Sequence, residues 1–146
     1  MKKFSFPLET ARRWRERQAE MEEARLQALF AEKQAIERRV AALVDELQAE
    51  HRRIEDRTCD ARELAMLDQF RTWANRDQQR LTAAQAECER RIAVQQAALV
   101  EARRRFRLVD RLKEKALIGW HAASEKEQED LAAELYLARR VRQRGE

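Results

Sequence analysis

The chain has 146 residues, of which 40% are charged and only 6% are aromatic. Two glycines and two cysteines exclude a glycine-rich phosphate loop and a disulfide framework, and a net charge of +4 permits anionic partners without requiring them. This length and composition are typical of one domain, 1–146, built from long helices without a globular core.

The first predicted helix covers about residues 6–56. Ser5 and Pro7 indicate its start, because the N–H that proline lacks would have no partner in the first turn of a helix. A stripe with a 3.5-residue repeat, the period of a coiled-coil seam, runs along this helix and is most apolar in the range 26–47. Its members are Leu8, Arg12, Arg15, Ala19, Glu22, Leu26, Leu29, Lys33, Ile36, Val40, Leu43, Leu47, Glu50 and Ile54.

The phase of this stripe does not carry into the next one, which indicates a break in the helix. Asp60 can act as an N-cap, and Glu63 stands three residues later, as in a capping box. We therefore predict a tight turn at about 57–60 and a second helix over about 61–120. Its stripe runs through Leu64, Leu67, Arg71, Ala74, Gln78, Leu81, Gln85, Cys88, Ile92, Gln95, Leu99, Ala102, Phe106, Val109, Lys113, Ala116 and Trp120.

Folding the chain back at the turn places the two stripes opposite each other in one consistent register. The expected pairs include Arg12 with Phe106, Glu22 with Gln95, Leu29 with Cys88 and Leu43 with Ala74. This register predicts an all-α fold: a long antiparallel two-helix coiled-coil hairpin with a C-terminal helical extension. The alternative is one uninterrupted helix that dimerises in parallel, and the phase slip at the turn counts against it.

The extension is predicted as a helical tail over about 124–143. Gly119 weakens the helix before it, and the stretch Ser124 to Glu127 repeats the capping-box pattern, so either a new helix begins there or the long helix bends. The tail has a thin apolar face and a basic end, made by Leu131, Leu135 and Val141 and by Arg139, Arg140, Arg142 and Arg144.

The sequence contains no catalytic motif, so we expect no enzyme activity, no cofactor and no metal site. His51, His121, Cys59 and Cys88 could in principle bind a metal ion, but Cys59 and Cys88 are about 40 Å apart by helical rise. The longest uncharged runs, 92–100 and 116–124, are too short to span a bilayer, and residues 1–4 lack the apolar region of a secretion signal. A cytoplasmic protein without membrane insertion is expected.

Two surfaces are candidates for partner binding. At the open end of the hairpin, the basic range 103–115 meets the arginines of the range 12–17, which favours an acidic partner, although these charges also serve solubility. Sequence-specific nucleic-acid recognition has no motif to support it. Near the turn, apolar and aromatic side chains flank the seam and form a possible contact patch or simply cap the seam; they are Val44, His51, Phe70 and Trp73.

The opening stretch Phe4 to Thr10, the Arg-Arg-x-Arg run after it, Asp68-Gln69-Phe70 after the turn and the basic segment Phe106 to Lys115 resemble the FliJ family. The proteins of this family are small soluble components of the flagellar type III export apparatus, and the start of the chain favours this branch over the similar stalk proteins of virulence type III secretion. The resemblance covers nearly the whole chain.

The resemblance implies a monomeric stalk, peripheral to the cytoplasmic membrane at the flagellar base, that couples the export ATPase ring to the export gate. Its partners would be the hexameric ATPase at the open end, the cytoplasmic domain of the membrane export gate near the turn, and export chaperones. The implied ATPase contacts are Leu8, Arg12, Arg13, Phe106, Arg107 and Arg111, together with the tail. The implied gate contacts are Leu47, His51, Phe70, Trp73 and Ala74.

Two other functions remain open at the level of sequence. A generic coiled-coil scaffold or dimeric adaptor would associate with itself through the seam. A binder of polyanions or membrane surfaces would use the arginine runs, and its affinity would fall steeply with salt.

Overall fold

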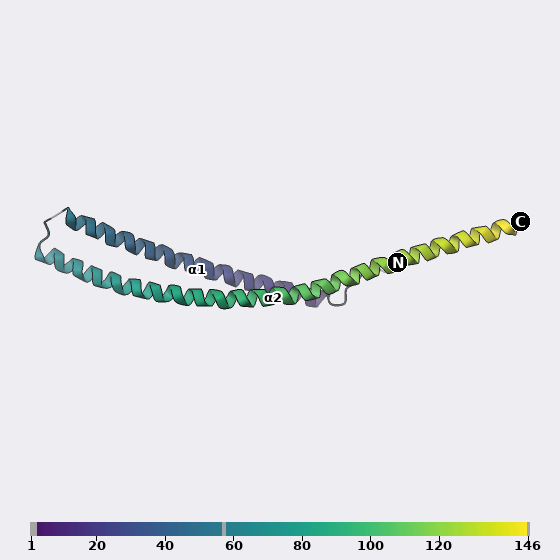
Figure 1. Cartoon of the computed structure of the whole chain (residues 1–146), viewed down its shortest axis with the longest axis horizontal. Coiled ribbons are helices and arrows are strands. Elements are labelled where there is room, and N and C mark those ends of the chain that lie inside the picture. The colour runs from purple at the N-terminus through teal and green to yellow at the C-terminus, as the bar shows by residue number, and fades with distance from the viewer. Residues whose placement is uncertain (1–2, 57, 146) are drawn as a thin grey trace. The chain divides into compact units, whose positions relative to one another are not determined.

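A computed structural model describes residues 3–56 and 58–145, and the described part contains two helices and no strand (Figure 1). Helix α1 covers Glu9–Glu55 and helix α2 covers Ala61–Arg144, with lengths of 47 and 84 residues. The two helices pack against each other in antiparallel directions, which confirms the predicted all-α hairpin. The predicted turn includes residue 57, which lies outside the described residues.

Helix α1 begins at Glu9 and not near residue 6 as predicted. The Glu9 N–H donates to the Phe6 carbonyl at 3.1 Å, so Pro7 and Leu8 stand in a turn that precedes the helix. The first helical hydrogen bond of this end joins the Arg12 N–H to the Leu8 carbonyl at 2.8 Å. Proline therefore pre-orders the approach to the helix and does not occupy its first turn.

Helix α2 begins where the sequence predicts. The Glu63 N–H donates to the Asp60 Oδ1 atom at 2.8 Å, which makes Asp60 the N-cap residue. The Leu64 N–H donates to the Asp60 carbonyl at 3.2 Å and closes the first turn. A side-chain cap of this kind satisfies one of the N–H groups that a helix start leaves without an internal partner.

Helix α2 continues to Arg144 as one helix, so of the two predicted alternatives a new helix at about residue 124 is wrong, and the predicted helical tail is the last part of α2. A glycine inside a helix costs only about 1 kcal/mol relative to alanine, which is too little to end a helix that has 84 residues. Ser124 does not begin a new helix either, because it lies within α2 and its side chain is buried.

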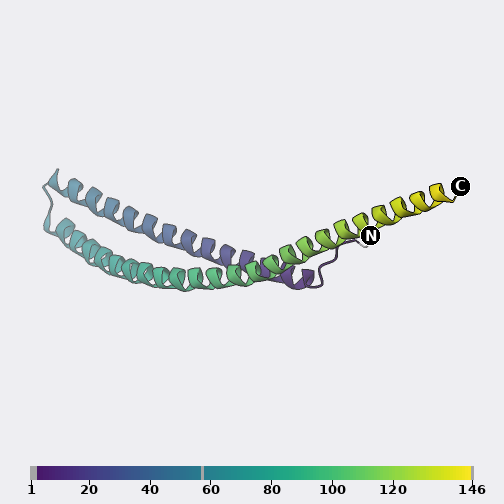
Figure 2. The ribbon, with the colours of Figure 1, turned by 45° about the vertical axis from the view of Figure 1, so that its right-hand side comes forward.

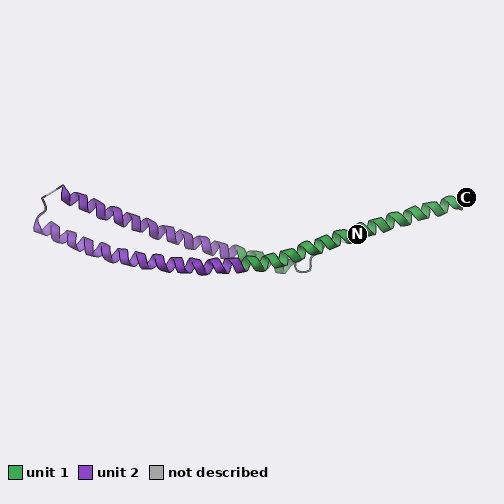
Figure 3. Cartoon of the chain, in the orientation of Figure 1, with its two compact units in different colours: residues 1–19, 102–146 green, residues 20–101 purple. Residues whose placement is uncertain are grey.

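The packing divides the chain into two compact units, which Figure 3 colours separately. Unit 1 contains Met1–Ala19 and Ala102–Glu146, and unit 2 contains Glu20–Glu101. Each unit combines a part of α1 with a part of α2.

Unit 2 holds the apolar core, which lies along the line where α1 and α2 meet. One cluster contains Leu26, Cys88, Ile92 and Leu99, and the other contains Leu43, Ala74 and Leu81. Ala74 is fully buried opposite Leu43, whose side chain is only 2% exposed. All these residues belong to the two predicted stripes, so the core is the pair of stripes brought together.

The predicted register is confirmed at three pairs for which the structure gives a direct contact. The Arg12 guanidinium lies 5.5 Å from the centre of the Phe106 ring. The Gln95 amide donates to the Glu22 carbonyl at 3.0 Å, and the Cys88 thiol lies 3.5 Å from the Leu29 carbonyl oxygen. The last two pairs lie in unit 2 and the first in unit 1.

In unit 1 the stretch before α1 lies beside α2 (Figure 2). The Phe4 ring makes an edge contact with the Trp120 ring at a centroid distance of 6.0 Å, and Trp120 makes a second edge contact with His121 at 5.0 Å. These contacts attach the N-terminal stretch to α2 beyond the start of α1. Within the described residues, no helix has a segment that is long and apolar enough to cross a bilayer.

Candidate partner-binding surfaces

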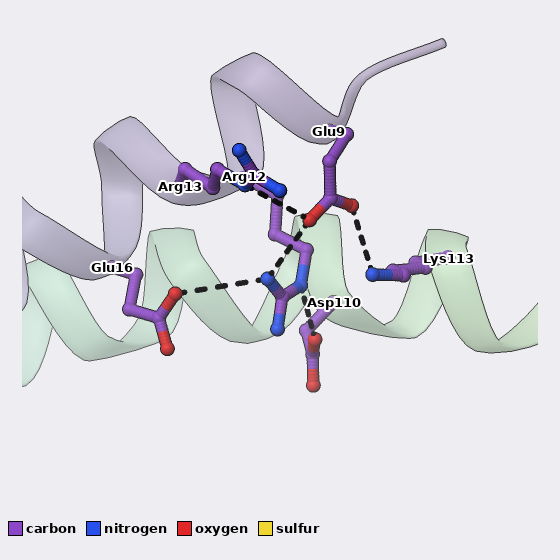
Figure 4. A network of polar contacts seen from close by, with 6 residues as sticks. All are labelled: Glu9, Arg12, Arg13, Glu16, Asp110 and Lys113. Atoms are coloured by element: carbon purple, nitrogen blue, oxygen red, sulfur yellow. Dashed lines mark hydrogen bonds and ion pairs between the residues drawn. The ribbon is translucent and has the colours of Figure 1, made fainter. Parts of the chain in front are cut away.

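The first turns of α1 and the facing part of α2 are joined by a network of ion pairs (Figure 4). Arg12 is its centre: the Nε atom lies 2.9 Å from Asp110 Oδ1, and the Nη1 atom lies 3.4 Å from Glu9 and 3.6 Å from Glu16. Glu9 also lies 2.9 Å from Lys113 Nζ across the two helices. Positive and negative groups therefore alternate between the helices, and the repulsion expected from the arginine runs is offset here.

This network shifts two pKa values in the direction that favours the charged forms. The pKa of Glu9 is lowered, chiefly by the hydrogen bond from Lys113 and also by the positive charges of Lys113, Arg12 and Arg13. The pKa of Arg12 is raised, chiefly by its hydrogen bond to Asp110. Both groups thus stay ionised over a wider range of pH.

The six residues implied as ATPase contacts fall into two groups. Arg12 and Phe106 are half-buried and contact each other, so they offer less of their side chains to a partner. The other four are exposed in unit 1; they are Leu8, Arg13, Arg107 and Arg111. Arg107 and Arg111 are one turn apart on α2, and the exposed Leu108 and Leu112 are their neighbours along the chain. This surface is both basic and partly apolar.

The implied gate contacts differ in their surroundings. Leu47 and His51 line a shallow depression together with Arg71. Phe70 lines a separate cleft of about 300 Å³ beside the turn, with Cys59, Ile54 and Leu64 among its walls. Ala74 is fully buried in the core and therefore presents no side-chain surface to a partner.

The aromatic pair near the turn consists of the half-buried Phe70 and the exposed Trp73. The Phe70 and Trp73 rings lie 5.8 Å apart between centroids, and the Trp73 side chain is 47% exposed. The Arg39 guanidinium from α1 lies 6.0 Å from the centre of the Trp73 ring on α2. Trp73 thus makes a cation–π contact with Arg39 and still exposes about half of its surface.

A buried carboxylate beside this pair was not identified from the sequence. Asp77 is only 7% exposed at its side chain, and it accepts hydrogen bonds from Arg39 at 3.3 Å and from Arg80 at 2.8 Å. Arg39 also pairs with Glu46 at 3.1 Å. Asp77 lies one turn from Ala74, so the sequence did contain a signal: an acidic residue close to a small residue of the seam.

In the part of the chain that the structure describes, no group of three His, Cys, Asp or Glu side chains is placed so that it could hold a metal ion. Both cysteines are free thiols: Cys88 is buried in the core of unit 2, and Cys59 is half-buried near the turn.

We compared the chain with models of protein families, with curated proteins and with solved structures, and none of the three comparisons finds a match. The ATPase and the export gate therefore stay partners that only the resemblance implies.

Proposed function

We propose that the chain is the stalk of a flagellar type III export apparatus, which couples the export ATPase ring to the membrane export gate and assists chaperone and substrate delivery. The observation that carries this proposal is the hairpin that buries its own seam. Leu43, Ala74 and Cys88 are covered by the other helix of the same chain. A single copy therefore needs no second chain to cover its stripes, as a stalk in the centre of a ring requires.

The same observation counts against a generic scaffold. A scaffold that dimerises through the seam would have to expose Leu43 and Cys88 to a second chain, whereas these side chains are 2% and 1% exposed. Opening the hairpin would expose the whole core of unit 2, at a cost of about 25 cal/mol for each Å² of apolar surface. A stalk of a virulence secretion system would share the fold and stays an alternative.

The proposed ATPase contact is the basic surface of unit 1. Arg107 and Arg111 are exposed there, and interfacial charges of this kind contribute to association rates and specificity. Reversing both charges with Arg107→Glu and Arg111→Glu should weaken binding to the hexameric export ATPase by at least roughly tenfold. The matched control reverses two exposed arginines of unit 2, Arg62→Glu and Arg76→Glu, and should leave binding unchanged.

The affinity is measured by surface plasmon resonance on the assembled ATPase ring at two salt concentrations. Equal affinities of the wild type and the Arg107→Glu, Arg111→Glu variant would refute the electrostatic contact. Tight binding of any polyanion by the wild type, with a steep salt dependence, would instead favour the polyanion binder.

The proposed gate contact is the aromatic pair near the turn. Phe70→Ala together with Trp73→Ala removes the half-buried Phe70 ring and the exposed Trp73 ring, and should abolish binding to the cytoplasmic domain of the gate while helicity is retained. The control is Val94→Ala, which truncates an exposed apolar side chain elsewhere on α2. Gate binding that survives the double substitution would remove this pair from the interface.

A further inference from the structure

The apolar side chains in the last twenty residues of α2 are exposed. Every described residue in the range 125–145 is exposed, including Leu131, Leu135 and Val141, and the Leu131 side chain is 58% exposed. Helix stability in proteins comes mainly from the packing of an amphipathic face. This segment, which we call the tail (125–144), therefore has an apolar face without a partner in unit 1.

The charges of the tail are sorted along its length. Its first half is acidic apart from Lys126 and contains Glu125, Glu127, Glu129, Asp130 and Glu134, whereas its second half contains Arg139, Arg140, Arg142 and Arg144. The helix dipole favours positive side chains at the C-terminal end of a helix, but this effect falls off within one turn. It therefore accounts only for the arginines of the last turn. The acidic half lies far from the start of α2 at Ala61 and cannot be explained in this way.

At a spacing of four residues, the tail has three pairs of like charge and one pair of opposite charge, Lys126 with Asp130. Glu125 and Glu129, Asp130 and Glu134, and Arg140 and Arg144 are pairs of like charge four residues apart on one face. Each such pair destabilises an isolated helix by about 0.2–0.5 kcal/mol. A partner helix with the opposite order of charges would turn this repulsion into attraction.

We propose that the tail pairs with the tail of a second copy of the chain, in antiparallel orientation. An antiparallel two-fold axis near residue 133 places Leu131 opposite Leu135 of the second copy, and Glu127 opposite Arg139 of the second copy. The acidic half of each tail then lies on the basic half of the other. A parallel pair would place like charges together, so the sequence of charges selects one orientation.

This pairing goes beyond the proposed stalk role and does not depend on it. It uses a surface different from the seam, so the hairpin stays intact in each copy. A copy that enters an ATPase ring with its tail would have to leave the pair first, and the pair is then the form of the protein outside the ring.

The test is sedimentation equilibrium of the full chain at increasing concentration and low salt. We expect the mass to rise from 17.4 kDa toward twice this value. Two variants reverse one half of the tail each: Glu127→Arg with Asp130→Arg, and Arg139→Glu with Arg142→Glu. Each variant alone should remain monomeric, because the substituted half of its tail then carries no net charge and the attraction between the acidic and basic halves is lost. An equimolar mixture of the two should regain association as a heterodimer.

The matched control is Arg62→Glu with Arg76→Glu, which reverses the charge of two exposed arginines in unit 2 and should associate like the wild type. Far-UV circular dichroism verifies that each variant keeps its helices. A wild type that stays monomeric at every concentration would overturn the proposal. So would association that survives either reversal, or a mixture that fails to form heterodimers.

Discussion

Leu43 is the side chain whose truncation best tests the packing of unit 2. It is 2% exposed and packs with Ala74, Leu81, Val40 and Leu47. Leu43→Ala removes three carbon atoms, which costs roughly 2.4 kcal/mol at about 0.8 kcal/mol for each buried methylene. The partner Ala74 is too small to fill the space, so a residual cavity should raise the cost to about 3 kcal/mol of unfolding free energy.

The assay is urea unfolding followed by circular dichroism at 222 nm, with Leu108→Ala as the control. Leu108 is 55% exposed on α2, and its truncation should cost less than about 1 kcal/mol while changing helix propensity in the same way. A loss at Leu43 equal to the loss at Leu108 would refute the reasoning, because Leu43 would then not be covered by α2 in solution.

Three single residues give further predictions. Glu9 has a lowered pKa in the folded chain, so its stabilising contribution is present above the ordinary glutamate pKa and is lost as the pH falls through the lowered value. The melting temperatures of the wild type and Glu9→Gln should therefore differ at neutral pH and converge in acid. A thiol reagent should modify Cys59 rapidly and Cys88 only when the hairpin opens, which mass spectrometry of timed samples measures. Asp77→Ala should cost about 1 kcal/mol by urea unfolding, since Arg39 loses a buried partner but keeps contact with water, and an unchanged midpoint would contradict this.

The pairing of the helices could be predicted from the sequence because it follows from one repeat and one turn. The stripe on each helix fixes which face is buried, and Asp60 fixes where the chain reverses. These two facts leave one register, and the contact of Leu29 with Cys88 lies in it. The repeat and the helix cap were sufficient to predict the core, because every buried apolar residue of the core lies on one of the two stripes.

The features that the sequence did not reveal depend on contacts outside the stripes. Phe4 packs on Trp120 although it precedes the first helix, and no periodicity connects the two residues. Asp77 does not lie on either stripe, and no repeat predicts its pairing with Arg39 across the two helices. Gly119 indicated a break, but a Cβ atom there would meet nothing within 4 Å, and the helix passes through. These contacts depend on how far side chains extend and on the free space around them in the folded chain, which no repeat in the sequence encodes.

The register of the hairpin limits how the chain can change in length during evolution. Leu29 meets Cys88 because nearly equal lengths of helix separate each of them from the turn. A deletion of one heptad from α1 on the turn side of Leu29 would keep its stripe on the same face, but Glu22 would then stand opposite the buried Cys88. Insertions and deletions should therefore occur in both helices together, in matched multiples of seven residues, so that related chains differ in the length of the hairpin while the pairs in its core are preserved.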